Sequence, residues 1–268
     1  MGSSRARVAA LAAKELAELR ATPSVLGGPL LMLATAVAVP FAIAVGVPWW
    51  SGEALADAED LVTMARESLS GTATLGAEGA VQALLLARFL PLLVLVPVIG
   101  AMSLVTTSIV DELRGRSLEP LLATPITTIE LLLAKAGSAF VVAIALLAAG
   151  AGLYVVAAMV LAETGVAIAL ASTQSAALVL GLAPAVAAAA VMLGVIASSR
   201  AKDARAAQQF SLVIVVPLIG LFVGQIAEGV TTPTLLACAG AAWTAAVGFA
   251  LAGVRVFDRE RILTRWTQ

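Results

Sequence analysis

The sequence contains no histidine, a single cysteine and few charges. Without histidine there is no Ser/His/Asp or Cys/His catalytic group, no histidine-ligated haem and no ordinary zinc site. Cys238 has no second cysteine to pair with, which excludes a disulfide framework, and its apolar surroundings favour an inert thiol. A GxxxxGK[ST] phosphate-binding loop is also missing. We therefore expect no enzyme activity, bound cofactor or metal in this chain.

What the sequence does contain is apolar residues in long runs. Of the 268 residues 61% are hydrophobic and 12% are charged, whereas about 25% of an ordinary soluble domain is charged. A helix of about 20 apolar residues crosses a bilayer, and each uncharged run is long enough for one crossing. We predict an all-α polytopic membrane protein with six transmembrane helices. The runs are residues 21–52, 89–110, 136–162, 164–199, 206–227 and 229–254.

The positive charges predict the orientation. Fourteen of the 16 Lys and Arg residues lie in alternate segments between the runs, and only Arg66 and Arg88 lie in the others. By the positive-inside rule we expect a protein of the cell membrane with both termini in the cytoplasm and the acidic stretch Glu53–Glu78 outside. A net charge of -1 gives no indication of nucleic-acid binding.

One membrane domain is expected, with short amphipathic segments at its edges. Residues 5–22 are expected to form an interfacial helix on the cytoplasmic leaflet, or a solvated helical tail. Residues 53–69 form either a helix with Leu61, Met64, Ala65 and Leu69 on one face or a solvated loop. The predicted spans are 25–49, 88–110, 131–161, 174–198, 207–227 and 233–255, with an external segment 50–85, cytoplasmic loops 111–130 and 199–206, and a tail 256–268.

Several residues within or beside the spans have more than one interpretation. Prolines including Pro91 and Pro184 should kink their helices. Arg88 is expected to extend to the interface by snorkelling, with substrate contact as the less favoured alternative. Gly220 and Gly224 form a GxxxG pattern that suits a helix or dimer interface, although the pattern is common in apolar sequence. Neutral polar residues could line a path or bond neighbouring helices: Ser103, Thr106, Thr107, Ser138, Tyr154, Gln174, Ser211 and Gln225.

The first cytoplasmic loop, residues 111–130, carries the most specific pattern. Three leucines, Leu118, Leu121 and Leu122, follow helical spacing within a charged rim, which suits docking into a groove on a soluble partner. Alternatively, the leucines pack under the membrane bundle. Thr124-Pro125 ends this short helix, and Glu130 lies in the first turn of the next.

The string SLEPLLATPITTIELLLAK resembles the loop between the second and third spans of type-two (ABC-2) ABC transporter permeases. Arg116-Ser117 stands where the family commonly has Gly-Thr, with Gly115 one position early. An amino-terminal Lys14-Glu15-Leu16 segment and six spans extend the resemblance over most of the chain. The residues in register are Leu118, Glu119, Leu121, Leu122, Thr124, Pro125, Glu130 and Lys135.

The resemblance implies that two permease copies, identical or different, form the membrane unit and that each docks a cytosolic ATPase, which binds ATP and Mg. Secondary contacts would come from Arg200, Lys202, Asp203 and Arg205. The ATPase-coupling residues would be Glu112, Arg114, Gly115, Arg116, Ser117, Leu118, Glu119, Leu121, Leu122, Thr124, Pro125 and Glu130.

We therefore predict the membrane subunit of an ATP-driven exporter, embedded in lipid, with an undefined substrate. One alternative is a permease-like subunit that transmits ATP-driven motion to an external partner without moving a solute. Another is a non-transporting membrane scaffold or assembly factor that uses the loop to bind protein. Few residues separate the fifth and sixth spans, so an external gate would have to come from the segment after the first span.

Overall fold

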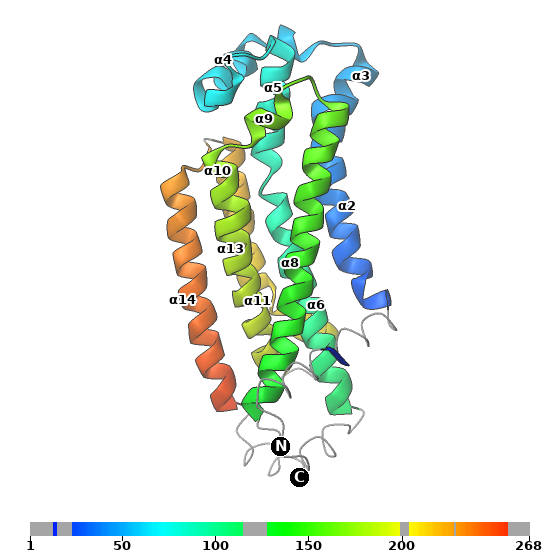
Figure 1. Cartoon of the computed structure of the whole chain (residues 1–268), viewed down its shortest axis with the longest axis vertical. Helices are drawn as coiled ribbons and strands as arrows, with labels where there is room; N and C mark the ends of the chain where they lie inside the picture. Colours follow the sequence, from blue (N-terminus) through cyan, green and yellow to red (C-terminus); the bar gives the residue numbers. More distant parts are fainter. Residues whose placement is uncertain (1–12, 15–22, 115–127, 199–203, 228, 257–268) are drawn as a thin grey trace.

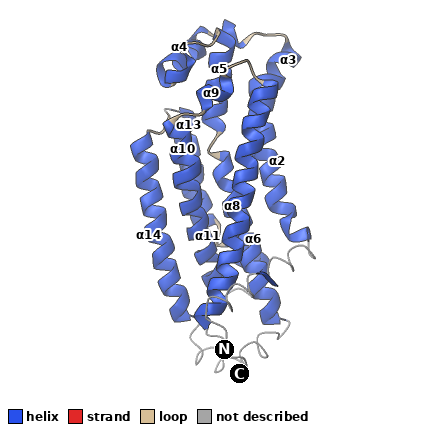
Figure 2. Cartoon of the chain, viewed as in Figure 1, coloured by secondary structure: helices blue, strands red, loops and turns tan. Residues whose placement is uncertain are grey.

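The computed structural model describes residues 13–14, 23–114, 128–198, 204–227 and 229–256. Within these ranges all regular structure is helical and no strand occurs (Figure 2). Six segments are long and apolar enough to cross a membrane, which confirms the predicted all-α, six-span fold: Gly27–Ser51, Ala77–Ile109, Leu133–Leu161, Thr173–Ser198, Ala206–Ala227 and Thr232–Gly253. The expected coupling helix, and the interfacial helix apart from residues 13–14, lie outside the described residues.

The spans run side by side along the long axis of the molecule (Figure 1). Several are built from more than one helical piece. Span 1 follows η1 (Pro23–Leu26) and joins α2 (Gly27–Phe41), the π-helical turn η2 (Ala42–Gly46) and α3 (Val47–Ser51). Span 2 joins α5 (Ala77–Phe89) to α6 (Leu92–Arg114), and span 3 is the single helix α8 (Thr128–Leu161). Span 4 joins α10 (Thr173–Ala176), the π-helical turn η5 (Ala177–Leu182) and α11 (Ala183–Ser198). Span 5 joins α12 (Ala204–Gln209) to α13 (Leu212–Ala227), and span 6 is α14 (Thr232–Val256).

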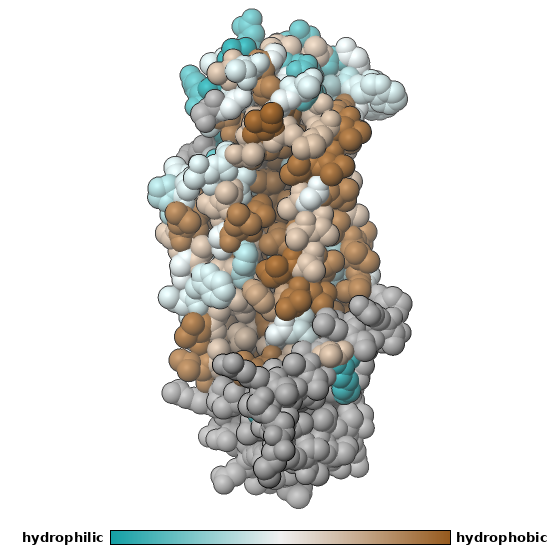
Figure 3. Space-filling model, in the orientation of Figure 1, coloured by the Kyte–Doolittle hydropathy of each residue, from teal (hydrophilic) through white to brown (hydrophobic). Residues whose placement is uncertain are grey.

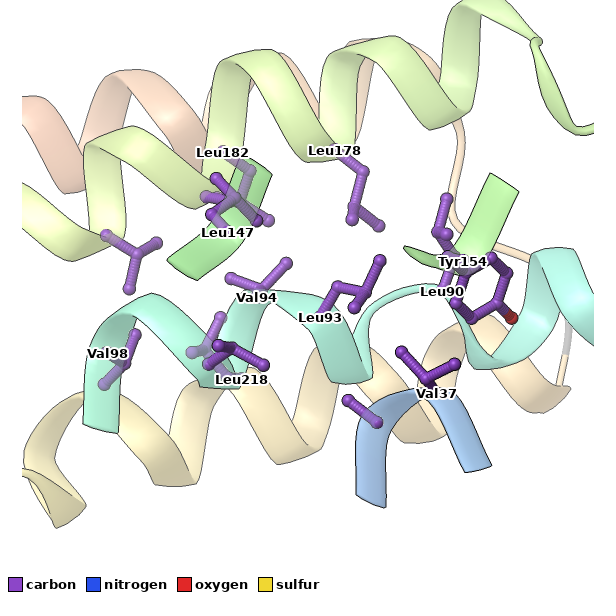
Figure 4. Packing of buried hydrophobic residues seen from close by; sticks show 14 of the residues in the cluster. Val37, Leu90, Leu93, Val94, Val98, Leu147, Tyr154, Leu178, Leu182 and Leu218 are labelled. Atoms are coloured by element: carbon purple, nitrogen blue, oxygen red, sulfur yellow. The ribbon is translucent and has the colours of Figure 1, made fainter. Parts of the chain in front are cut away.

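Spans 2 and 4 form the core of the bundle. In the most apolar 18-residue stretch of spans 2 and 4, 67% and 61% of the residues are buried, whereas the share in no other span exceeds 28%. Helix α6 packs against α2, α8 and α11, and α11 packs against α14. Figure 3 shows the apolar belt that remains exposed along the sides of the bundle, as expected for a surface in contact with lipid. Figure 4 shows the packing between these helices, including Leu93, Val94, Leu147, Leu178 and Leu182.

Short helices cover one end of the bundle, which we call the α4 end (Figure 1). They are η3 (Leu55–Asp57), α4 (Glu59–Ser68), η4 (Ser70–Thr72) and α9 (Val166–Leu170). On the apolar face expected for residues 53–69, Ala65 and Leu69 are buried, but Met64 is 40% exposed. The Thr72 hydroxyl donates to the Leu69 carbonyl at 2.7 Å, which fixes the turn that follows α4. The segment between spans 1 and 2 is therefore folded onto the bundle.

The opposite end is where α6 ends at Arg114 and α8 begins at Thr128, and we call it the α6–α8 end. The 13 residues between these helices lie outside the described part of the chain. The two helices pack against each other within the bundle. Whatever contacts the intervening segment therefore acts on two helices that are already in contact.

Candidate functional site

Span 2 is broken between α5 and α6, next to Pro91. Proline has no N–H to donate to the carbonyl four residues earlier, and its ring clashes with that carbonyl. The Leu90 amide donates to the Ala87 carbonyl, three residues earlier, at 3.4 Å. It therefore does not donate to the Leu86 carbonyl, which would be its partner in a continuous α-helix. The break thus leaves the Leu86 carbonyl without its helical partner.

Tyr154 supplies that missing partner. Its hydroxyl donates to the Leu86 carbonyl at 2.7 Å, from α8. The side chain is 2% exposed, and its ring meets Phe41 edge to face with centroids 5.1 Å apart. Figure 4 shows Tyr154 beside the chain at Leu90. A buried carbonyl needs a donor, so the only tyrosine in the sequence makes this proline break tolerable.

Arg88 lies in the last turn of α5, immediately before the break. The structure contradicts the expectation that it snorkels, because the side chain is 8% exposed. One guanidinium nitrogen, Nη1, donates to the Gln225 carbonyl, and it lies 3.4 Å from the Ile226 carbonyl. Both carbonyls belong to the last turn of α13, where orphan carbonyls and the helix dipole attract a cation. The apolar helical segment that contains Arg88 begins at Ala77, so Arg88 lies inside this segment and not at its start.

Two glutamines join α10, α13 and the turn before α14 beside Arg88. The Val230 amide donates to Gln225 Oε1 at 2.8 Å, and Gln174 Nε2 lies 3.4 Å from the same oxygen. Gln174 Nε2 also donates to the Val230 carbonyl. The turn between α13 and α14 contains Gly229, whose φ of +80° suits glycine, and a Cβ there would lie 3.1 Å from Arg88 Nη1.

This polar cluster borders a cavity of about 310 Å³ at the α4 end. Arg88, Gln174 and Gln225 line one part, and Thr231 and Thr232 extend it toward α14. The remaining wall comes from α5 and from the end of α4: Leu84, Ala87, Ser68 and Leu69. The cavity thus lies where spans 2, 4, 5 and 6 meet the helices that cover the bundle.

The α6–α8 end holds the flanks of the predicted coupling segment. Lys135 is 3% exposed, and its ammonium donates to the Ser108 hydroxyl at 2.7 Å, joining α8 to α6. Glu130, in the first turn of α8, is 6% exposed. Burying charged residues costs free energy unless they are hydrogen-bonded. The burial of Lys135 and Glu130 therefore depends on the way α6 and α8 pack at this end.

The structure places few of the other predicted contact residues. Glu112 and Arg114 lie on the last turn of α6, and Arg205 lies on α12. The remaining predicted residues lie outside the described part of the chain: Gly115, Arg116, Ser117, Leu118, Glu119, Leu121, Leu122, Thr124, Pro125, Arg200, Lys202 and Asp203. Their assignment remains a prediction.

Most polar residues considered as path lining bond to neighbouring backbone. The Ser103 hydroxyl donates to the Val25 carbonyl at 3.2 Å, linking α6 to η1. The Thr106 and Ser138 hydroxyls donate to carbonyls of their own helices, Met102 and Lys135. Only Gln174 and Gln225 reach the cavity at the α4 end.

Gly220 and Gly224 line an apolar groove between α13 and α14, with α11 as its floor. The groove measures about 560 Å³. A Cβ at Gly220 would meet no atom within 4 Å, and one at Gly224 would meet only Val230, at 3.7 Å. The glycines therefore do not serve close packing between two helices of this chain, and their predicted role between chains stays a prediction.

The sequence matches the model of the ABC-2 family transporter protein over residues 9–250. This chain belongs to the ABC-2 transporter family. Membership in the ABC-2 family identifies it as the permease component of an ABC transporter and as a multi-pass membrane protein. No curated protein matches the sequence. The ABC-2 match takes in all six spans of the described structure up to residue 250, including both ends of the bundle described above.

Proposed function

We propose that this permease is the membrane subunit of an ATP-driven exporter and works with a separate cytosolic ATPase. The observation that carries the proposal is the family match together with the SLEPLLATPITTIELLLAK string. The chain has no phosphate-binding loop of its own, so ATP and Mg would be held by the partner. The α6–α8 end and both termini would face the cytosol, and the α4 end would face outward.

In this proposal the segment from Glu112 to Glu130 docks on the ATPase, with Arg200, Lys202, Asp203 and Arg205 making further contacts. The geometry of the flanking helices supports this role. The bond between Lys135 and Ser108 ties α8 to α6 just inside the segment. A push on the segment would therefore move the two helices as a pair and would reach the core through α6, which packs against α11.

The working unit in this proposal contains two permease copies. Gly220 is exposed and Gly224 is half-buried in the groove between α13 and α14, and small residues allow helices to approach closely in lipid. Only 11% of the residues in the most apolar stretch of span 5 are buried within one chain, so the others are at least partly accessible to lipid or to a second copy.

Co-purification tests the proposal. The tagged permease is expressed with its ATPase, and the ATPase recovered from the membrane fraction is measured together with its ATP hydrolysis. Leu121→Asp and Glu119→Lys should each remove most of the bound ATPase. Leu121→Asp places a charge among the docking leucines, and Glu119→Lys reverses the charge beside them. Glu59→Lys is the matched control, since Glu59 is an exposed acid on α4 at the opposite end.

Full recovery of the ATPase with both loop variants would contradict docking through this segment. Recovery of no ATPase by the unmodified permease would contradict the transporter role and favour the scaffold alternative. Loss of ATPase with Glu59→Lys alone would place the docking surface at the α4 end and reverse the proposed orientation.

A further inference from the structure

We propose that the cavity around Arg88 binds a phosphate-type oxyanion, carried by a lipid headgroup or by a free solute. The site does not depend on ATPase coupling, because all of its residues lie at the α4 end. It goes beyond the proposed function, which leaves the substrate undefined.

The first reason is the charge of Arg88. The side chain is more than nine-tenths buried, and among the residues that the structure describes no carboxylate lies within ion-pair distance of it. Glu228, beside Gly229 in the sequence, is not among the described residues. Burial of a charge is costly unless something pairs with it, so the cavity is a place where an anion would be stabilised.

The second reason is the number of unused donors. A guanidinium has five N–H groups in a planar fork, and the described contacts of Arg88 are made by Nη1 alone. The carbonyls of α13 therefore occupy one edge of the fork. Nε and Nη2 have no acceptor among the described residues, and this is the edge that binds carboxylate and phosphate in bidentate fashion.

The third reason is the orientation of Gln225, which is 4% exposed. The Val230 amide can only donate, so the side-chain atom 2.8 Å from it must be the amide oxygen of Gln225. The amide nitrogen therefore points elsewhere, and it has no acceptor within the described structure. Gln225 thus adds a second buried donor to a cavity that already holds a cation.

The size of the cavity fits a single small anionic group. At about 310 Å³ it lies at the lower end of the range of small-molecule pockets. Ser68, Thr231 and Thr232 also line the cavity, and the Thr231 hydroxyl is hydrogen-bonded to that of Thr234. Leu69 and Leu84 supply apolar surface, so a phosphate attached to an apolar body could also be held.

The test uses the purified full-length permease in detergent, freed of lipid. Binding of phosphatidylglycerol and of diacylglycerol, which lacks phosphate, is measured by native mass spectrometry. Thermal unfolding is measured with inorganic phosphate and with chloride at equal ionic strength. We expect phosphatidylglycerol to bind at least about tenfold more tightly than diacylglycerol, because a charged hydrogen-bonded pair supplies that factor.

Variants assign the effect to the cavity. Arg88→Gln should weaken phosphatidylglycerol binding about tenfold to a hundredfold, and Arg88→Lys should weaken it less. Gln225→Glu keeps an oxygen for the Val230 amide but places a carboxylate beside Arg88, so it should fold normally and still lose anion binding. Arg66→Gln, at an exposed cation on α4, is the control and should change nothing.

The two sources of the anion give different results. Displacement of phosphatidylglycerol by inorganic phosphate, with a phosphate-dependent rise in thermal stability, indicates a site for the free anion. Binding that inorganic phosphate does not displace indicates a lipid site. The proposal is overturned if the folded Gln225→Glu and Arg88→Lys variants bind phosphatidylglycerol as tightly as the unmodified protein. Where Arg88→Gln also folds, its binding must be unchanged as well.

Discussion

The break in span 2 allows a sharp test of how this bundle tolerates a buried proline. Tyr154→Phe removes only the hydroxyl that donates to the Leu86 carbonyl and keeps the ring that contacts Phe41. Interhelical hydrogen bonds in membranes are worth about 0.6 kcal/mol on average and up to about 1.7 kcal/mol. The Leu86 carbonyl has no helical donor to fall back on, so we expect a loss of about 1–2 kcal/mol in unfolding free energy, near the upper end.

The cause of this loss can be separated from a general effect of the substitution. Pro91→Ala restores an N–H at position 91, which lets the chain close a continuous helix in which Leu90 donates to Leu86. Tyr154 then becomes redundant. In the Pro91→Ala background Tyr154→Phe should therefore cost less, by a coupling energy of about 1 kcal/mol in a double-mutant cycle.

The assay is unfolding of the purified permease by sodium dodecyl sulfate in mixed micelles, followed by the fluorescence of its four tryptophans. The reasoning is refuted if Tyr154→Phe unfolds like the unmodified protein. It is also refuted if the substitution costs the same with alanine at position 91 as with proline, because the hydroxyl would then not compensate for the break.

Three further substitutions test other parts of the structure. A Cβ at Gly194 would lie 2.3 Å from Val105 Cγ1, so Gly194→Ala should lower the unfolding free energy by about 1–3 kcal/mol, whereas Gly240→Ala, with open space around it, should not. Lys135→Met keeps most of the apolar stem but removes the donor to Ser108, and a loss of about 1–3 kcal/mol in the same unfolding assay is expected; an unchanged curve would show that the tie does not stabilise the α6–α8 pair. Glu59→Cys in a Cys238→Ala background should react with a membrane-impermeant maleimide on intact cells, and reaction only after permeabilisation would reverse the proposed orientation.

The six-span fold could be predicted from the sequence because charges are excluded from the hydrocarbon core and so mark the ends of the spans. The same rule does not locate Arg88, because this charge is buried inside the apolar helical segment Ala77–Ile109. The partner groups of Arg88 are carbonyls on α13, 137 and 138 positions later in the chain, and no local pattern identifies them. The local sign in the sequence is a lone arginine beside an apolar run, three residues before Pro91.

The polar contacts at the α4 end could not be predicted for a related reason. Backbone groups carry most of them: the Leu86 carbonyl, the Gln225 carbonyl and the Val230 amide. Every residue has such groups, and only a break or a turn leaves them in need of a partner. The coupling loop is the opposite case, because its prediction rests on side chains in a specific order, and those residues lie outside the described structure.

The uneven burial of the spans has a consequence for how the sequence can vary. Most residues in the apolar stretches of spans 2 and 4 are buried, so a change of one methylene there must be matched by a neighbouring helix. In the apolar stretches of spans 5 and 6 only 11% and 17% of the residues are buried within a single chain. Most positions there need only an apolar side chain that is compatible with lipid, and many residues meet that need equally well. Relatives of this permease should therefore diverge fastest along the outward faces of α13 and α14, and a position there that resists change would mark where another molecule binds.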